Sequence, residues 1–244
     1  MADDGVEDGI VKGGISPPTD ALTDLPFETG MLRSALADFL NMPVDDPTLG
    51  AIRLGGYRWG VYAFFDYDDE PIYVGQTKET LRTRIRRHLT NQRTDAVAMN
   101  VLDPFEVCSI AVWPLSQFQQ TASGDKDAKA YLDALEHSVF HRLREESQFK
   151  AVLNEKDPPE PRVAVVEPTP VRGLIVTDDV SALRDHPDLR IARRAMTLSR
   201  LAQVICERKV AGGLRRVLVT QAKRLQWLAE RRYQYTADAV GDEE

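Results

Sequence analysis

The stretch GVYAFFDYDDEPIYVGQT, Gly60–Thr77, decides the fold of this 244-residue chain. Apolar residues alternate in both of its halves, as Val61 and Ala63 do in the first and Ile72 and Val74 in the second. This period of two is typical of β-strands, and the acidic segment DYDDEP between the halves is rich in turn residues. The stretch therefore predicts a β-hairpin with a solvated acidic turn.

Two helices and a third strand are expected after the hairpin. The segment TLRTRIRRHLTNQ places Leu81, Ile85 and Leu89 on one helical face. FEVCSIAVWPL, Phe105–Leu115, has the composition of a strand, and KDAKAYLDALEHSVFHRLREES has the apolar stripe of a longer helix. The order β-β-α-β-α predicts a small α+β domain over residues 57–155.

The regions that flank this domain differ from it in composition. Residues 1–20 are acidic, rich in glycine and without periodicity, so they are expected to form a disordered tail. We further expect an N-terminal helical segment at 21–56, a Pro-rich connector with short strands at 156–189, a basic helical hairpin at 190–235 and an acidic tail at 236–244.

The charge of the chain is unevenly distributed around a formal net value of −7. Residues 190–235 hold twelve Lys and Arg side chains against Glu207 and Glu230, a local balance that suits a polyanionic partner. Cys108 and Cys206 are far apart and have no metal-binding spacing. Without a secretory signal or a long apolar run, we expect a cytoplasmic protein that does not enter a membrane.

Several polar side chains occupy positions that usually pack against a core. On the expected first helix Arg84 and His88 border the apolar face, and Glu136 lies on the packed face of the second. A buried Glu136–Arg84 ion pair with a purely structural role would also explain these positions. Tyr62 and Tyr73 can project to one side of the hairpin, although tyrosine is common in strands in any case.

Together these groups match the needs of phosphodiester hydrolysis. That reaction needs a base to deprotonate water, a cation to neutralise charge on the phosphate, and a carboxylate to anchor a divalent metal ion.

The same residues resemble the GIY-YIG nuclease superfamily, and most of all its restriction-endonuclease branch. Gly60-Val61-Tyr62 and Tyr73-Val74-Gly75 correspond to its two signatures. LRTRIRRH corresponds to its helix signature, DALEHSV to its metal-binding glutamate and AVLN to its closing asparagine. The segments that resemble the family span about Tyr57 to Asn154.

The resemblance implies a catalytic set of Tyr62, Tyr73, Arg84, His88, Glu136 and Asn154. Tyr62 would act as the general base or help to activate it, with Arg84 and His88 as the cations that lower its pKa. Tyr73 would position the phosphate or the water, Arg84 would hold the scissile phosphate, and His88 would assist proton transfer. Glu136 would bind one Mg²⁺ or Mn²⁺ per active site. Arg82 is a rival of Arg84 for the phosphate.

These features predict a metal-dependent DNA endonuclease, of a restriction or other defence type, that works on DNA. A cut through both strands would require a homodimer or sequential nicking by one chain. Two alternatives are a non-catalytic DNA-binding protein on a nuclease fold and a repair-type, structure-specific incision nuclease. The basic hairpin is expected to grip the DNA backbone, or else to serve dimerisation or packing. The residues expected to bind DNA are Arg82, Arg86, Arg87, Arg215, Arg216, Lys223 and Arg224.

Overall fold

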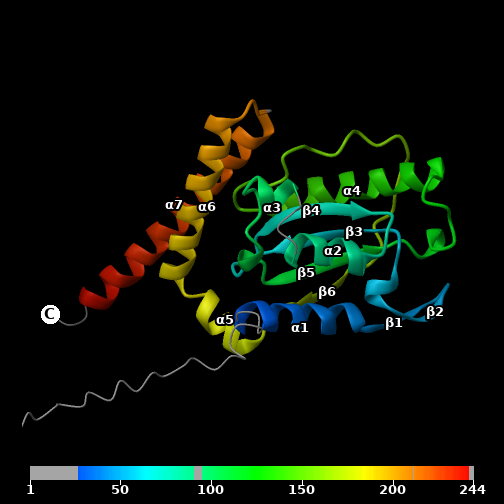
Figure 1. Ribbon diagram of the computed structural model, residues 1–244, viewed down its shortest axis with the longest axis horizontal. Helices are drawn as coiled ribbons and strands as arrows, with labels where there is room; N and C mark the ends of the chain where they lie inside the picture. Colours follow the sequence, from blue (N-terminus) through cyan, green and yellow to red (C-terminus); the bar gives the residue numbers. More distant parts are fainter. Residues whose placement is uncertain (1–26, 91–94, 211, 242–244) are drawn as a thin grey trace, which may run out of the picture.

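A four-stranded antiparallel sheet forms the centre of the molecule, which we describe from a computed structural model for residues 27–90, 95–210 and 212–241 (Figure 1). The strands lie in the order β4-β3-β5-β6, with bounds Pro71–Thr77, Gly60–Phe65, Ser109–Pro114 and Val171–Leu174. The expected hairpin and third strand are therefore present, and the α+β fold class is confirmed. The disordered tail expected at 1–20 lies outside the described residues.

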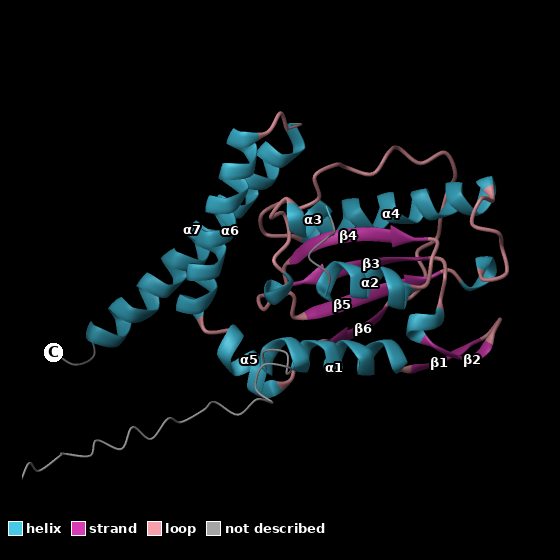
Figure 2. Ribbon diagram, viewed as in Figure 1, coloured by secondary structure: helices cyan, strands magenta, loops and turns pink. Residues whose placement is uncertain are grey.

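Helices cover both faces of this sheet (Figure 2). The helices are α1 (Phe27–Asn41), α2 (Leu81–Thr90), α3 (Asp95–Ala98), α4 (Lys126–Glu146), α5 (Asp178–Arg184), α6 (Pro187–Glu207) and α7 (Gly212–Gly241). Short 3₁₀ turns occur at Leu54–Gly56, Pro104–Glu106 and Ser116–Phe118. In the described part of the chain, no helix is both long and apolar enough to cross a bilayer.

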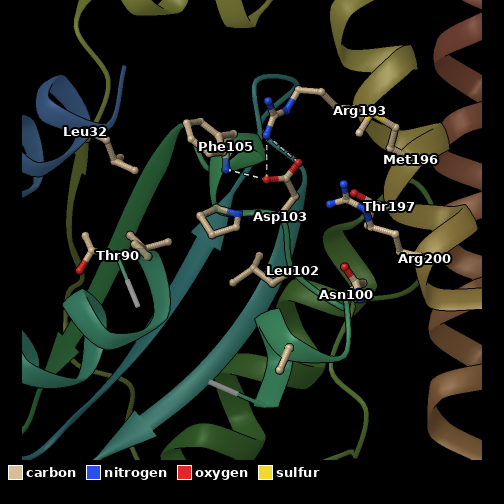
Figure 3. Close-up of a pocket in the computed structure, with 13 residues that line it drawn as sticks. Leu32, Thr90, Asn100, Leu102, Asp103, Phe105, Arg193, Met196, Thr197 and Arg200 are labelled. Carbon is tan, nitrogen blue, oxygen red and sulfur yellow. Dashed lines mark hydrogen bonds and ion pairs between the residues drawn. The ribbon is translucent and has the colours of Figure 1, made fainter. Parts of the chain in front are cut away.

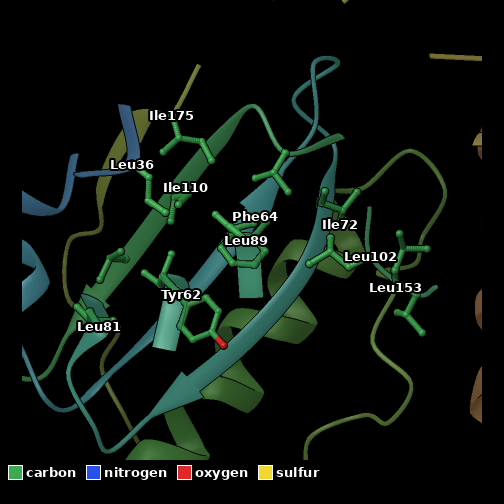
Figure 4. Close-up of a cluster of buried hydrophobic side chains, with 14 of the residues drawn as sticks. Leu36, Tyr62, Phe64, Ile72, Leu81, Leu89, Leu102, Ile110, Leu153 and Ile175 are labelled. Carbon is green, nitrogen blue, oxygen red and sulfur yellow. The ribbon is translucent and has the colours of Figure 1, made fainter. Parts of the chain in front are cut away.

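The alternation along β3 divides the core into two layers. Tyr62 and Phe64 face the layer that contains Leu36 of α1 and Leu81 of α2, which Figure 4 shows. The other side chains of β3, such as Val61, face a second layer against α4. All six residues of β3 are buried, because helices occupy both sides of the strand.

The acidic turn between β3 and β4 is buried at its two ends, Asp66 and Glu70, which corrects the expectation of a solvated loop. The side chain of Asp66 is 1% exposed. Its Oδ1 accepts hydrogen bonds from the backbone N–H groups of Asp68 and Glu70, and its Oδ2 accepts from Arg194 at 2.9 Å and Arg224 at 2.6 Å. The turn is thus the site at which the C-terminal helices dock.

Helices α6 and α7 form the expected hairpin, which stands beside the sheet domain in Figure 1. Arg190 and Arg194 of α6 are buried against Asp66 and Asp68. Arg194 also donates from Nε to Glu106 at 2.9 Å. Part of the positive charge of the hairpin is therefore neutralised inside the protein.

Several boundaries differ from the expected ones. A small two-stranded sheet, β1 (Pro43–Asp46) with β2 (Gly50–Arg53), follows α1 where only helix was expected. In the connector, β6 pairs with β5, whereas residues 163–166 form no strand. Helix α7 continues to Gly241, six residues beyond the expected end of the hairpin at 235.

Candidate active site

Tyr62 and Gly75 lie opposite each other in the β3–β4 ladder and form the centre of the site. The phenol of Tyr62 passes directly over Gly75, since a Cβ at that position would lie 2.6 Å from the Tyr62 hydroxyl oxygen. Only a residue without a side chain leaves room for the phenol here. The glycine of the second signature thus lets the tyrosine of the first reach the edge strand.

Arg84 meets this phenol from helix α2. Its Nε donates a hydrogen bond to the Tyr62 hydroxyl at 3.3 Å. Burial, and then the neighbouring Tyr73, raise the pKa of Tyr62 well above its ordinary value, whereas the charge of Arg84 acts in the opposite direction. The phenol is therefore protonated in the resting protein, and positive charge is what can activate it.

His88 is buried one turn further along α2. Its ring lies 5.2 Å from that of Tyr73 and 5.9 Å from that of Tyr62, measured between centroids. Burial, followed by the charges of Arg84 and Arg87, lowers the pKa of His88 to about 4. This shift favours the neutral imidazole at pH 7, which leaves Arg84 as the cation that contacts Tyr62.

Glu136 approaches the same edge strand from α4, on the opposite face of the sheet. Its Oε2 accepts a hydrogen bond from Gln76 Nε2 at 2.7 Å. Burial raises the pKa of Glu136 to about 7, against the opposing effect of the Gln76 hydrogen bond. The charge of Arg84 also acts to lower the pKa of Glu136, but Arg84 and Glu136 form no direct ion pair of the kind that a purely structural role would use.

Asn154 holds the backbone of the second signature. Its Oδ1 accepts from the N–H of Val74 at 3.0 Å, and its Nδ2 donates to the carbonyl of Val74 at 2.7 Å. Val74 lies between Tyr73 and Gly75, so Asn154 fixes the position of both neighbours. The geometry makes Asn154 a positioning residue, since its polar atoms are engaged by the main chain.

An open cavity brings Arg84 and the neighbourhood of Glu136 together. Arg84, Gln76 and Lys129 are among the residues that line this cavity. The ammonium group of Lys129 forms an ion pair with Asp133. Its described lining residues include four cations against one carboxylate: Arg58, Lys78, Arg84, Lys129 and Glu79. A cavity with this charge balance suits a phosphodiester. Sequence reasoning missed Gln76 and Lys129, although Gln76 alternates with Val74 and so faces α4.

The residues expected to bind DNA divide into exposed and engaged groups. Arg86, Arg215 and Lys223 are exposed. Arg87 pairs with Glu79 at 2.8 Å, and Arg216 with Asp157 at 2.6 Å.

Two of the arginines expected to bind DNA, Arg82 and Arg224, bind groups of the protein itself instead. Arg82 donates to the Leu40 carbonyl at 3.0 Å and to the Asn41 side chain, so it caps the end of α1 and is no rival of Arg84. Arg224 is buried on Asp66. Both arginines therefore stabilise the fold.

A second cavity lies between α2 and α6 and holds none of the catalytic candidates (Figure 3). Arg193 reaches into it from α6, where its guanidinium binds both carboxylate oxygens of Asp103 at 2.9–3.0 Å. Phe105 packs beneath Arg193 at 4.4 Å. Arg193, the cation that reaches into this cavity, is thus already paired with Asp103. The candidate active site therefore remains the one around β4.

The side chains around Glu136 fit a divalent metal ion that is completed by its substrate. Among the described residues, no three His, Cys, Asp or Glu side chains are placed to enclose a metal ion by themselves. Mg²⁺ is commonly bound by one or two carboxylates together with substrate phosphates and water. Glu136 offers one carboxylate, bound to Gln76 of the cationic cavity, which agrees with this mode.

Comparison with known proteins finds a match that covers part of the site. Residues 58–122 match the family model described as the GIY-YIG catalytic domain, a stretch that contains Tyr62, Tyr73, Arg84 and His88. No curated protein and no solved structure matches the chain. Glu136 and Asn154 lie beyond the matched residues, so their assignment rests on the geometry. Residues 58–122 thus match the catalytic domain of a nuclease, or phosphodiester hydrolase, family, which indicates a nuclease of the DNA endonuclease type.

Proposed function

We propose that the protein is a divalent-metal-dependent DNA endonuclease with one active site around strand β4. The observation that carries this proposal is the contact of Arg84 with the Tyr62 hydroxyl at 3.3 Å, directly above Gly75 and beside the cationic cavity. A potential base and a phosphate-binding cation are thereby held together. The other cations of the cavity, such as Lys129, favour a polyanionic substrate.

In the proposed reaction the scissile phosphate lies in the cavity against Arg84. The guanidinium stabilises the negative charge that develops on the phosphate, and it also stabilises the phenolate of Tyr62. Tyr62 first loses its own proton to solvent, and the resulting phenolate accepts a proton from the attacking water. Tyr73 restricts where the phosphate or the water can lie. His88 packs its neutral ring against both tyrosines and keeps their rings in place.

Glu136 is the residue that would hold the Mg²⁺ or Mn²⁺ ion, with oxygens of the substrate and water as the remaining ligands. When bound, such an ion supplies positive charge that lowers the pKa of nearby water and stabilises the leaving oxygen.

Linearisation of supercoiled plasmid by the purified full-length protein tests the proposal. Cleavage is expected with Mg²⁺ and is expected to be absent with EDTA. Glu136→Gln should abolish cleavage while DNA binding survives, because Glu136 would hold the metal ion whereas the cations of the cavity would bind the DNA phosphates. Tyr62→Phe should cut at least 100-fold more slowly, because general base catalysis contributes about 10²–10⁴-fold. Tyr131→Phe is the matched control, since Tyr131 belongs to α4 and packs in the layer on the other face of the sheet.

Cutting that persists in EDTA, or that survives Glu136→Gln, would refute the metal-dependent mechanism. Equal rates for Tyr62→Phe and Tyr131→Phe would remove Tyr62 from the reaction. DNA binding without any cleavage under these conditions would favour a non-catalytic DNA-binding protein.

A restriction-type role, cytoplasmic location and homodimer complete the proposal. The helix α1 before the domain and the segment FKAVLN at its close support the restriction branch. The described residues of each chain form one such site, so cutting both strands at once with this site requires two copies. Fixed cut positions in both strands, together with a dimer in sedimentation, are the expected result. Incision of one strand only at distorted DNA would favour a repair-type nuclease.

A further inference from the structure

The side-chain amide of Gln76 lies between two carboxylates of helix α4. Its Nε2 donates to Glu136 Oε2 at 2.7 Å and to Asp133 Oδ1 at 2.8 Å. An amide nitrogen carries two protons, so each carboxylate receives one of them. The two bonds fix the plane of the amide and, through it, the position of the Glu136 carboxylate.

Asp133, the second acceptor of the Gln76 amide, is itself held by a neighbouring side chain. Asp133 forms an ion pair with Lys129, one helical turn before it on α4. Asp133 is partly buried, with a side chain 26% exposed. Lys129 therefore balances the charge of the carboxylate that accepts the second proton of Gln76.

The backbone of Gln76 belongs to β4, directly after Gly75. The donor therefore comes from a strand held in the sheet, whereas Glu136 is on a helix and has rotatable side-chain bonds. With Oε2 bound to Gln76, the other oxygen of Glu136 remains for a cation. Hydrogen-bond partners of metal-binding carboxylates commonly orient them, and their loss costs about 10–100-fold in metal affinity.

We propose that Gln76 is a positioning residue for the divalent metal ion. It orients the Glu136 carboxylate toward the cavity and uses Asp133 and Lys129 as its own support. This inference rests on the proposed function, because it takes Glu136 as the ligand of the ion.

Mn²⁺ binding to the full-length protein without DNA, followed by electron paramagnetic resonance, tests this inference. Gln76→Met keeps the size of the side chain and removes both donors, so Mn²⁺ binding should weaken about 10–100-fold. The Mg²⁺ concentration for half-maximal cleavage should rise by the same factor, while the rate at saturating Mg²⁺ stays within a few-fold. Gln226→Met is the matched control, since Gln226 donates to Glu230 at 2.8 Å on the exposed face of α7.

Two further variants make the test independent of one substitution. Gln76→Asn is too short to reach both carboxylates and should weaken Mn²⁺ binding in the same direction. Asp133→Asn keeps an oxygen acceptor for the amide and should leave Mn²⁺ affinity within a few-fold. A loss with Asp133→Asn as large as that with Glu136→Gln would make Asp133 a direct ligand and overturn the proposal.

Unchanged Mn²⁺ affinity in Gln76→Met and Gln76→Asn would also overturn it, even if cleavage were slower. Failure of the proposed function has a different signature. In that case the unmodified protein would bind no Mn²⁺ or would cut no DNA, and Glu136→Gln would behave as the unmodified protein does.

Discussion

Arg224 and Asp66 are separated by 158 residues, and the guanidinium of one lies 2.6 Å from the carboxylate of the other. Both side chains are almost fully buried, and Arg194 binds the same oxygen of Asp66 at 2.9 Å. The helical hairpin is thereby joined to the turn that connects the two strands of the active site.

Asp66→Ala should strongly destabilise the protein, because it leaves Arg194 and Arg224 buried without their carboxylate. Removal of one partner of a buried pair costs about 3–5 kcal/mol. Urea denaturation measures this free energy. Asp188→Ala is the control, since Asp188 pairs with Arg232 on the exposed face and its loss should change little. Equal unfolding midpoints for the two variants would contradict the buried network.

Gly75→Ala should impair catalysis and lower stability. Its Cβ would lie 2.6 Å from the Tyr62 hydroxyl, so the phenol must move away from Arg84. Overpacking of this kind costs about 1–3 kcal/mol. Plasmid cleavage and thermal unfolding follow both effects. At Gly56 the nearest atom to a new Cβ is 3.6 Å away, so Gly56→Ala should behave as the unmodified protein. Full activity in Gly75→Ala would show that catalysis does not need the Tyr62 phenol in its position over Gly75.

Burial of His88 should make stability depend on pH in the acid range. Its pKa is about 4 in the folded protein, below the ordinary value of 6.5. Between these values the unfolded chain binds more protons, so stability falls as pH drops from 6.5 to 4. The full loss is about 3 kcal/mol, since one pKa unit equals about 1.4 kcal/mol. His88→Phe should remove this part of the pH dependence in urea titrations at pH 4–7. An unchanged dependence would mean that the imidazole is not desolvated.

Exposed basic residues of α7 should contribute to DNA affinity through the phosphates. Arg215→Ala with Lys223→Ala should lower the slope of log affinity against log salt by about two, roughly one for each phosphate contact. Fluorescence anisotropy of a labelled duplex at several salt concentrations measures the slope. Gln226→Ala on the same helix should leave it unchanged. A slope that stays constant in the double variant, together with loss of dimer, would assign this face to dimerisation.

The parts of the fold that the sequence predicted are those with local signals. Strand alternation around Tyr62 and Tyr73, and the helical spacing of Arg84, His88 and Glu136, depend on neighbours within a few residues. The acidic turn could not be read in this way, because the arginines that bury Asp66 come from helices more than 120 residues later. In isolation, a run of acids between two strands has the composition of a solvated loop.

The same limit applies to individual side chains of the site. Arg224 has the spacing of an outward-facing residue on its helix, and only the docking of α7 shows that it is buried. Gln76 carries no charge and belongs to no motif, so its contact with Glu136 depends on how α4 crosses β4. His88 was recognised by its position, but its neutral state follows from a burial that sequence spacing does not reveal.

The two hydrogen bonds between Asn154 and Val74 affect whether strand β4 can pair with a strand of another molecule. Strand β4 is an outer strand of its sheet, and outer strands expose N–H and carbonyl groups that can pair with another chain. Asn154 occupies both groups of Val74, and the N–H of Leu153 binds the carbonyl of Ile72 at 2.9 Å. The strand that carries the second signature is therefore closed to strand addition along part of its length, which protects a catalytic edge from aggregation.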